Sequence, residues 1–142
     1  MKRFEFLEHT SDAYVAAYGR TLEEAFENAA LAMFEVMTDT SKVEPRERFE
    51  VSATGFDLYS LLYNWLEELL IIYYVNNVLL SRFKVREIAR EGEEYHIAGE
   101  AYGEPFDPSR HEQRVEVKAV TYSLMEIKEK DGEYEVRVVF DI

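Results

Sequence analysis

The stretch Val138-Val139-Phe140-Asp141-Ile142 closes the sequence and has the apolar character of a β-strand. It ends on two neighbouring negative groups, the side chain of Asp141 and the free α-carboxylate of Ile142. Terminal residues are usually frayed, so an apolar strand that continues to the last residue predicts an end that the fold holds in place. Immediately upstream, Lys130-Asp131-Gly132-Glu133 is typical of a hairpin turn, and it predicts an antiparallel partner for this strand.

Outward from this hairpin, the hydrophobic pattern predicts two helices and six further strands. The expected order is β-β-α-β-α-β-β-β-β in one domain over residues 1–142. Two helices packed on a largely antiparallel sheet make a two-layer α+β fold. The first expected strand begins at Phe4 and ends near His9, and the others cover residues 13–18, 48–54, 83–89, 95–102, 115–128 and 134–140.

Both helices have recognisable starts. Thr21-Leu22-Glu23-Glu24 is a capping-box sequence, and apolar residues then recur at helical spacing from Leu22 to Met37. Asp57 is a good N-cap for a second helix, whose apolar residues between Leu58 and Tyr73 cover more than half of its circumference. That density predicts a helix buried between layers, and the polar residues within it argue against a membrane span.

Composition excludes several classes of function. The sequence has no cysteine, which rules out disulfides and thiolate chemistry. The formal net charge is −13, and no basic run is present, so we expect no direct binding of nucleic acid. A basic protein surface or a divalent cation is a more natural partner for such an acidic chain. The start of the sequence has no apolar segment typical of a signal peptide, so we expect a cytoplasmic protein with no membrane association.

A candidate cation site follows from the position of Asp12, at the start of the second expected strand. If that strand and the last one are antiparallel neighbours, Asp12, Asp141 and the terminal carboxylate of Ile142 converge. Like charges this close favour a counter-charge, and hard oxygen ligands suit calcium, magnesium or manganese. The alternative is that Asp12 caps a turn and Asp141 lies at an exposed, frayed end.

Three other residues leave their roles open. Lys118 is expected on the strand 115–128, where alternation places Val115 and Val117 on the opposite face. It either pairs with a cross-strand acid or reaches toward the clustered carboxylates or a ligand held by a partner. His9, near an apolar strand, and His111, after a long loop, are each compatible with a structural or a functional role.

Common catalytic motifs are absent from the sequence. It contains no P-loop, dinucleotide-binding glycine pattern, nucleophile elbow or zinc-protease motif. No set of acid, base and nucleophile stands out among the remaining residues. We therefore expect an accessory or binding protein in place of an independent enzyme.

The sequence resembles the archease family from one end to the other. The resemblance rests on motifs that occur in order and at matching spacing, including the terminal Phe140-Asp141-Ile142 and His111. Ser11 and Glu8 depart from the residues most common in the family, and neither is a proposed ligand. The remaining motifs are Phe4–Asp12, Tyr18–Ala30, Met37-Thr38-Asp39, Leu62–Leu66 and Val117–Tyr122.

The resemblance implies a function. Archeases are accessory proteins of the RNA ligase of tRNA splicing; they promote guanylylation of a histidine of the ligase, sustain multiple turnover and can broaden its choice of nucleotide. It further implies that Asp12, Asp141 and Ile142 form the family's divalent-cation site and that Lys118 is its essential lysine. A general chaperone for RNA or proteins and a free-standing metal-dependent phosphoesterase are the alternative functions.

Overall fold

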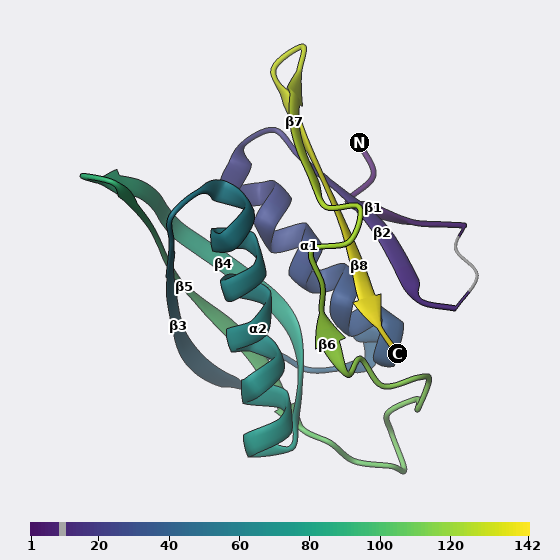
Figure 1. Cartoon of the computed structure of the whole chain (residues 1–142). Helices are drawn as coiled ribbons and strands as arrows, with labels where there is room; N and C mark the ends of the chain where they lie inside the picture. The colour runs from purple at the N-terminus through teal and green to yellow at the C-terminus, as the bar shows by residue number, and fades with distance from the viewer. Residues whose placement is uncertain (9–10) are drawn as a thin grey trace.

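A computed structural model of the chain describes residues 1–8 and 11–142. Figure 1 shows how the helices and sheets are arranged, and the order of elements agrees with the α+β fold expected from the sequence. The elements are β1 (Phe4–Leu7), β2 (Ala13–Gly19), α1 (Leu22–Met37), η1 (Thr40–Lys42), β3 (Glu47–Gly55), α2 (Leu58–Asn76), β4 (Val78–Glu91), β5 (Glu94–Pro105), β6 (Ala119–Val120), β7 (Glu126–Lys130) and β8 (Glu133–Asp141).

The strands form two antiparallel sheets. The first sheet has the order β1-β2-β8-β6, with β7 also paired to β8, and the second has the order β3-β5-β4. Helix α1 packs against β2 and β8 of the first sheet and against β4 of the second, as Figure 1 shows. Helix α2 packs mainly on the second sheet and also contacts β6 and β7. The core therefore lies between the sheets and is filled by both helices.

Two details differ from the sequence-based prediction. The single expected sheet is two sheets, and the strand expected over residues 115–128 is two strands, β6 and β7, with irregular chain before and between them. Val115 and Val117 were expected on the same face of this strand, but Val115 is exposed and Val117 is fully buried. The alternation expected for this segment was therefore wrong. The prediction of one domain over residues 1–142 stays a prediction.

The start of each helix follows from its capping residues. The Glu24 amide donates to Thr21 Oγ1 at 3.0 Å, while the Glu24 carboxylate accepts from the amide of Arg20, one residue earlier than in a regular capping box. Asp57 Oδ1 accepts from the Ser60 amide at 2.7 Å, which confirms Asp57 as the N-cap of α2. The fully buried Trp65 of α2 donates from Nε1 to the Phe26 carbonyl at 3.1 Å and thereby joins the two helices.

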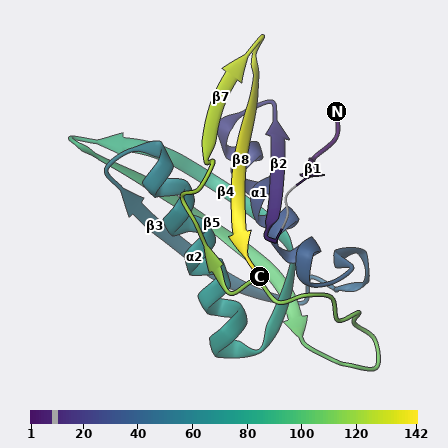
Figure 2. The ribbon, with the colours of Figure 1, turned by 45° about the vertical axis from the view of Figure 1, so that its right-hand side comes forward.

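The last strand has the partners that its sequence predicts. Asp131 and Gly132 have φ values of 54° and 78°, as a tight hairpin turn between β7 and β8 requires. Figure 2 shows β8 lying between β2 and the short β6 near the end of the chain. Among residues 1–8 and 11–142, no helix has the length and apolar character needed to cross a membrane.

Candidate functional site

The register of β2 and β8 brings Asp12 next to Asp141. Ala13 of β2 lies opposite Phe140 of β8 in an antiparallel pair. The residue before Ala13 is Asp12 and the residue after Phe140 is Asp141, so these two are the next pair in the same register. Directly opposite residues of antiparallel strands have Cβ atoms about 5 Å apart and project to the same face. The structure thus places Asp12 and Asp141 at the same end of two adjacent strands of the first sheet.

The end of β8 is held by the core. Val138 and Phe140 are fully buried, and the side chain of Ile142 packs against the core cluster. Because side chains alternate along a strand, burial of Phe140 directs the intervening Asp141 side chain to the other face of the sheet, where it is exposed. The expectation of a chain end held in place is confirmed, and its terminal carboxylate follows directly after Asp141.

Lys118 lies on the other side of β8 from Asp12. Its amide donates to the Asp141 carbonyl oxygen at 2.7 Å, and the next residue, Ala119, is paired with Asp141. The preceding residue, Val117, is fully buried, and its carbonyl accepts from the hydroxyl of Tyr74 at 2.7 Å. The backbone at Lys118 is therefore fixed on both sides while its side chain is exposed.

Within the described part of the chain, the ammonium group of Lys118 forms no ion pair. The exposed Lys118 directly precedes β6 and the exposed Asp141 ends the adjacent β8, yet within the described residues no ion pair joins their charged groups. The cross-strand acid that would have explained Lys118 as a structural residue is not found among these residues. This arrangement leaves the ammonium group available to a bound molecule.

These residues fit the donor set that a hard divalent cation requires. Two aspartate carboxylates and a terminal carboxylate supply only oxygen atoms, the ligands that calcium, magnesium and manganese favour. Among residues 1–8 and 11–142, no cluster of three His, Cys, Asp or Glu side chains suited to a metal is found. The set predicted here has two such side chains, Asp12 and Asp141, with a main-chain carboxylate as the third group, and cation binding by it stays a prediction.

His111 lies elsewhere, in a buried polar cluster. Its Nδ1 accepts from the Asp107 amide at 2.9 Å, so the proton is on Nε2, which lies 3.0 Å from Glu104 Oε2. The same Glu104 oxygen accepts from the Glu44 amide at 2.7 Å, and the other carboxylate oxygen pairs with Arg110. All the hydrogen-bonding groups of the imidazole are used within the fold, and they anchor the loop before His111, for which the sequence left a structural and a functional role open.

The environment of Glu104 keeps its carboxylate ionised. Burial alone would raise the pKa of Glu104, but the hydrogen bonds from the Glu44 amide, His111 and Arg110 outweigh burial and lower the pKa to about 2. No local sequence pattern indicated a role for this residue, which lies in β5 between Gly103 and Pro105. His9, whose role was also left open, lies outside the residues that the structure describes.

An apolar surface adjoins Lys118. A cavity of about 330 Å³ is lined by residues of α2 and of the segment that leads into β6. Within it, Ile71, Tyr74 and Val75 are 45%, 47% and 75% exposed. We refer to these three side chains as the α2 apolar surface. They lie at the C-terminal end of a helix that buries Leu61, Trp65 and Leu69, and the apolar pattern of the helix did not distinguish them from those core residues.

Comparisons with known proteins agree on one family. A model of the Archease protein family matches residues 4–142. The chain is 51% identical over 142 residues to a protein named archease from Sulfurisphaera tokodaii, with 100% of each sequence covered. It is 53% identical over 135 residues to the archease of Aeropyrum pernix, covering 95% of this chain and 94% of that protein.

Solved structures show the same fold. The solution structure of a Methanobacterium thermoautotrophicum protein matches with a TM-score of 0.88 and 52% identity over 100% of both chains. A crystal structure from Thermotoga maritima, of an archease described as a possible chaperone, matches with a TM-score of 0.59 and 20% identity, covering 96% of this chain and 94% of that one. At 20% identity the second structure shows only that the fold is shared.

Proposed function

The chain belongs to the archease family, and on that premise we propose that it activates the RNA ligase of tRNA splicing. In this proposal the protein promotes guanylylation of the ligase's active-site histidine and sustains multiple turnover. It acts as an accessory factor and carries out no reaction of its own. The observation that supports this best is the convergence of Asp12, Asp141, the end of the chain and Lys118 on three adjacent strands.

Guanylyl transfer needs its phosphate charges neutralised and its reacting groups aligned. A divalent cation, when bound, supplies charge neutralisation at the triphosphate. The Asp12 and Asp141 carboxylates and the terminal carboxylate of Ile142 would hold that cation at the surface. Their placement at the open end of the sheet allows a partner's ligands to complete the coordination.

Lys118 complements the carboxylates. Its ammonium group donates hydrogen bonds and accepts none, so its natural partners are a phosphate or carboxylate on the ligase. The hydrogen bonds to the main chain on either side of it, from Tyr74 to Val117 and from Lys118 to Asp141, fix the base of the side chain. A functional group held on a rigid base is better positioned than one on a mobile loop.

The α2 apolar surface supports docking of a protein next to this site. It lines the same cavity as Lys118, and exposed apolar patches are typical of protein interaction sites. The net charge of −13 favours association with a basic surface, and an RNA ligase must carry such a surface to bind its substrate. We therefore place the ligase's contact across Ile71, Tyr74 and Val75.

A guanylylation assay with labelled GTP and the ligase tests this proposal. Asp141→Asn, Lys118→Ala and a one-residue extension after Ile142 should each lower the stimulated rate by about tenfold or more. Asp131→Asn removes the same charge at the opposite end of β8, in a turn where asparagine is well tolerated, and should stimulate normally. Normal stimulation by the extended protein would exclude a role for the terminal carboxylate.

Two further assays separate the alternative functions. Binding to unrelated unfolded proteins with little dependence on salt would favour a general chaperone that uses the α2 apolar surface. Hydrolysis of small phosphoesters without any ligase would favour a free-standing enzyme. The ligase activator predicts neither result, and it predicts that chelation of divalent cations abolishes the stimulation.

A further inference from the structure

A second cavity lies between α1, the start of β1 and the edge strand β4. It has a volume of about 510 Å³, within the range of small-molecule sites. Five of the residues that line it are basic and two are acidic, a formal side-chain charge of +3 in a chain whose net charge is −13. Its basic residues are Lys2, Arg3, Arg20, Arg82 and Lys84.

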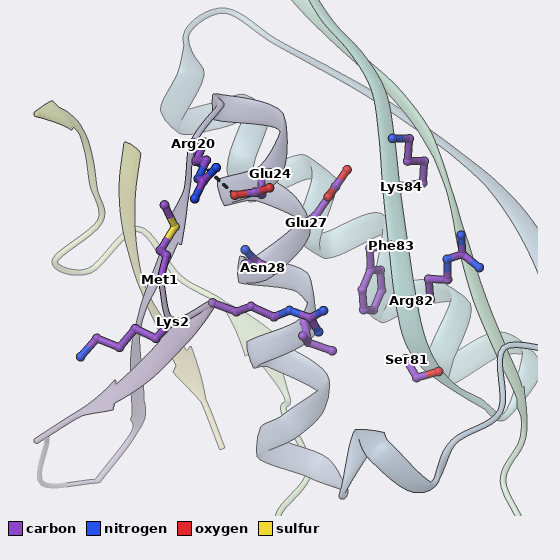
Figure 3. A pocket seen from close by; sticks show the side chains of 12 residues that line it. Met1, Lys2, Arg20, Glu24, Glu27, Asn28, Ser81, Arg82, Phe83 and Lys84 are labelled. Carbon is purple, nitrogen blue, oxygen red and sulfur yellow. Dashed lines mark hydrogen bonds between the residues drawn. The ribbon is translucent and has the colours of Figure 1, made fainter. Parts of the chain in front are cut away.

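The two acids of this cavity are engaged by the main chain. Glu24 accepts from the Arg20 amide at 2.9 Å, and Glu27 accepts from the Val85 amide at 2.8 Å. Figure 3 shows the Glu27 side chain extending from α1 toward β4. Burial raises the pKa of Glu27, which favours its neutral form. Neither carboxylate forms an ion pair with a basic side chain within residues 1–8 and 11–142.

Three of the basic side chains form no ion pair within the described residues, although one of them, Lys84, lies near enough to the Glu27 carboxylate for its charge to oppose the rise in the pKa of Glu27. Lys2 pairs with Glu5 at 2.7 Å, and Arg82 lies over the ring of Tyr102. Throughout the described ranges, by contrast, no ion pair or side-chain hydrogen bond is found for the remaining three, Arg3, Arg20 and Lys84. Figure 3 shows Arg20 and Lys84 on separate walls of the cavity, at the start of α1 and on β4.

We propose that this cavity binds a small compound with several phosphate groups, such as a di- or triphosphate. Arginine and lysine donate charge-assisted hydrogen bonds that suit phosphate oxygens. Three cations from separate segments surround this one cavity and suit a ligand with several negative charges. A ligand with a single carboxylate would neutralise only one of the three cations. Leu31 and Phe83 supply apolar walls beside the cations.

A long nucleic acid fits this cavity less well than a small ligand does. Its affinity depends on neutralising successive phosphates along an extended basic surface. The basic side chains here are confined to one cavity, and the chain as a whole carries a charge of −13, which repels a polyanion beyond the cavity mouth. A short polyphosphate gains the local attraction without that repulsion.

This site is separate from the carboxylate site of the proposed function. Asp12 precedes β2 and Arg20 follows it, so the length of the strand separates the two sites by roughly 25 Å. The proposal therefore stands on residues that the carboxylate site does not use. It adds a ligand-binding site to the opposite end of the first sheet.

Titration calorimetry with inorganic tripolyphosphate at about 0.1 M salt tests the proposal directly. The double variant Arg20→Gln/Lys84→Gln should bind about tenfold more weakly or worse, since it loses two charge-assisted contacts. A matched control is Lys42→Gln/Lys130→Gln, which also removes two exposed basic groups, in η1 and in the β7–β8 hairpin. The control should bind within about twofold of the original protein.

Three outcomes would overturn the proposal. One is the absence of binding by the original protein at about 1 mM tripolyphosphate. Another is an equal loss of affinity in both double variants, which would indicate a general charge effect. The third is tighter binding of a single-stranded RNA than of tripolyphosphate, abolished by Arg20→Gln/Lys84→Gln, which would make the cavity part of a nucleic-acid surface. Thermal melts of each variant check that the fold is retained.

Discussion

Two polar clusters of this protein have similar composition and opposite environments. The buried cluster consists of Glu104 and His111, with the exposed Arg110 at its edge, and every hydrogen-bonding group of its imidazole is used. The carboxylate site consists of Asp12, Asp141, the end of the chain and Lys118, and it lies at the surface, where Lys118 and Asp141 are exposed. A buried ionised group persists when partners satisfy it, whereas exposed charges need no such partners and are accessible to a ligand.

The difference between the environments of these two clusters indicates which polar residues of this fold are structural. His111 follows a long loop, and the sequence left both a structural and a functional role open for it. Its side chain is fully buried and joins β5 to residues 107–111, so its contacts explain it. Lys118 has a fixed main chain and an exposed ammonium group with no such explanation within the described residues. We therefore expect substitutions in the buried cluster to change stability and substitutions in the carboxylate site to change activity.

The largest effect is expected from Glu104→Ala. It leaves the Glu44 amide, His111 and Arg110 without their common acceptor. Removing one partner from a buried ionic cluster costs about 3–5 kcal/mol, and we expect the free energy of unfolding to fall by about that amount. Urea titration measures it, and Glu94→Ala, at an exposed site of the same strand, should change it by less than about 0.5 kcal/mol.

If Glu104→Ala lowers the free energy of unfolding no more than Glu94→Ala does, the buried cluster contributes no more to stability than an exposed residue. The contrast between the two clusters would then be wrong. His111 and its loop would again be candidates for function. A large loss of stability with normal ligase stimulation by the folded fraction would instead support the assignment of this cluster to structure alone.

The next effect concerns acid stability. The pKa of Glu104 is about 2 in the fold against an ordinary value of 4.5. A lowered pKa contributes stability that is fully present above pH 4.5 and is lost as the pH falls toward 2. This difference corresponds to a contribution on the order of 3 kcal/mol. The original protein should therefore exceed Glu104→Gln in unfolding free energy at pH 5, and this difference should shrink at pH 2. A difference that is the same at both pH values would contradict the prediction.

A smaller effect is expected when calcium is added. A cation that binds only the folded protein stabilises it by about 2.7 kcal/mol at a hundredfold excess over its dissociation constant. Calcium should raise the melting temperature of the original protein, and a chelator should reverse the shift. Asp141→Asn should lose this response while Asp131→Asn keeps it. A calcium response that survives both Asp12→Asn and Asp141→Asn would place the cation elsewhere.

Local signals accounted for much of the fold. Thr21 and Asp57 marked the helix starts, and Asp131-Gly132 marked the last hairpin, because capping and turn geometry depend on a few neighbouring residues. The division into two sheets depends on long-range pairing, which no local pattern specifies. The segment around Val117 deviated for the same reason, since its position is set by contacts with α2 and β8.

The sequence analysis placed Asp12 and Asp141 together on the premise that their strands are antiparallel neighbours, and the structure pairs those strands. Cation binding by these residues stays a prediction. The basic cavity could not be found in this way, since Arg3, Arg20 and Lys84 come from three segments and form no basic run. Glu104 gave no signal either, because its partners Glu44 and Arg110 meet it only in the folded chain.

The smallest effect on stability, and the sharpest test of the comparison, is expected from Lys118→Ala. The ammonium group has no ion pair among the residues that the structure describes, so the unfolding free energy should change by less than about 0.5 kcal/mol. Ligase stimulation should nevertheless fall by about tenfold or more, because a donor to the partner is lost. Lys128→Ala, which removes a lysine that pairs with Glu126 at 3.4 Å, is the matched control and should leave stimulation unchanged. If stimulation falls in proportion to stability in both variants, Lys118 would act through stability alone. The carboxylate site and the buried cluster would then differ only in exposure, and both would be structural.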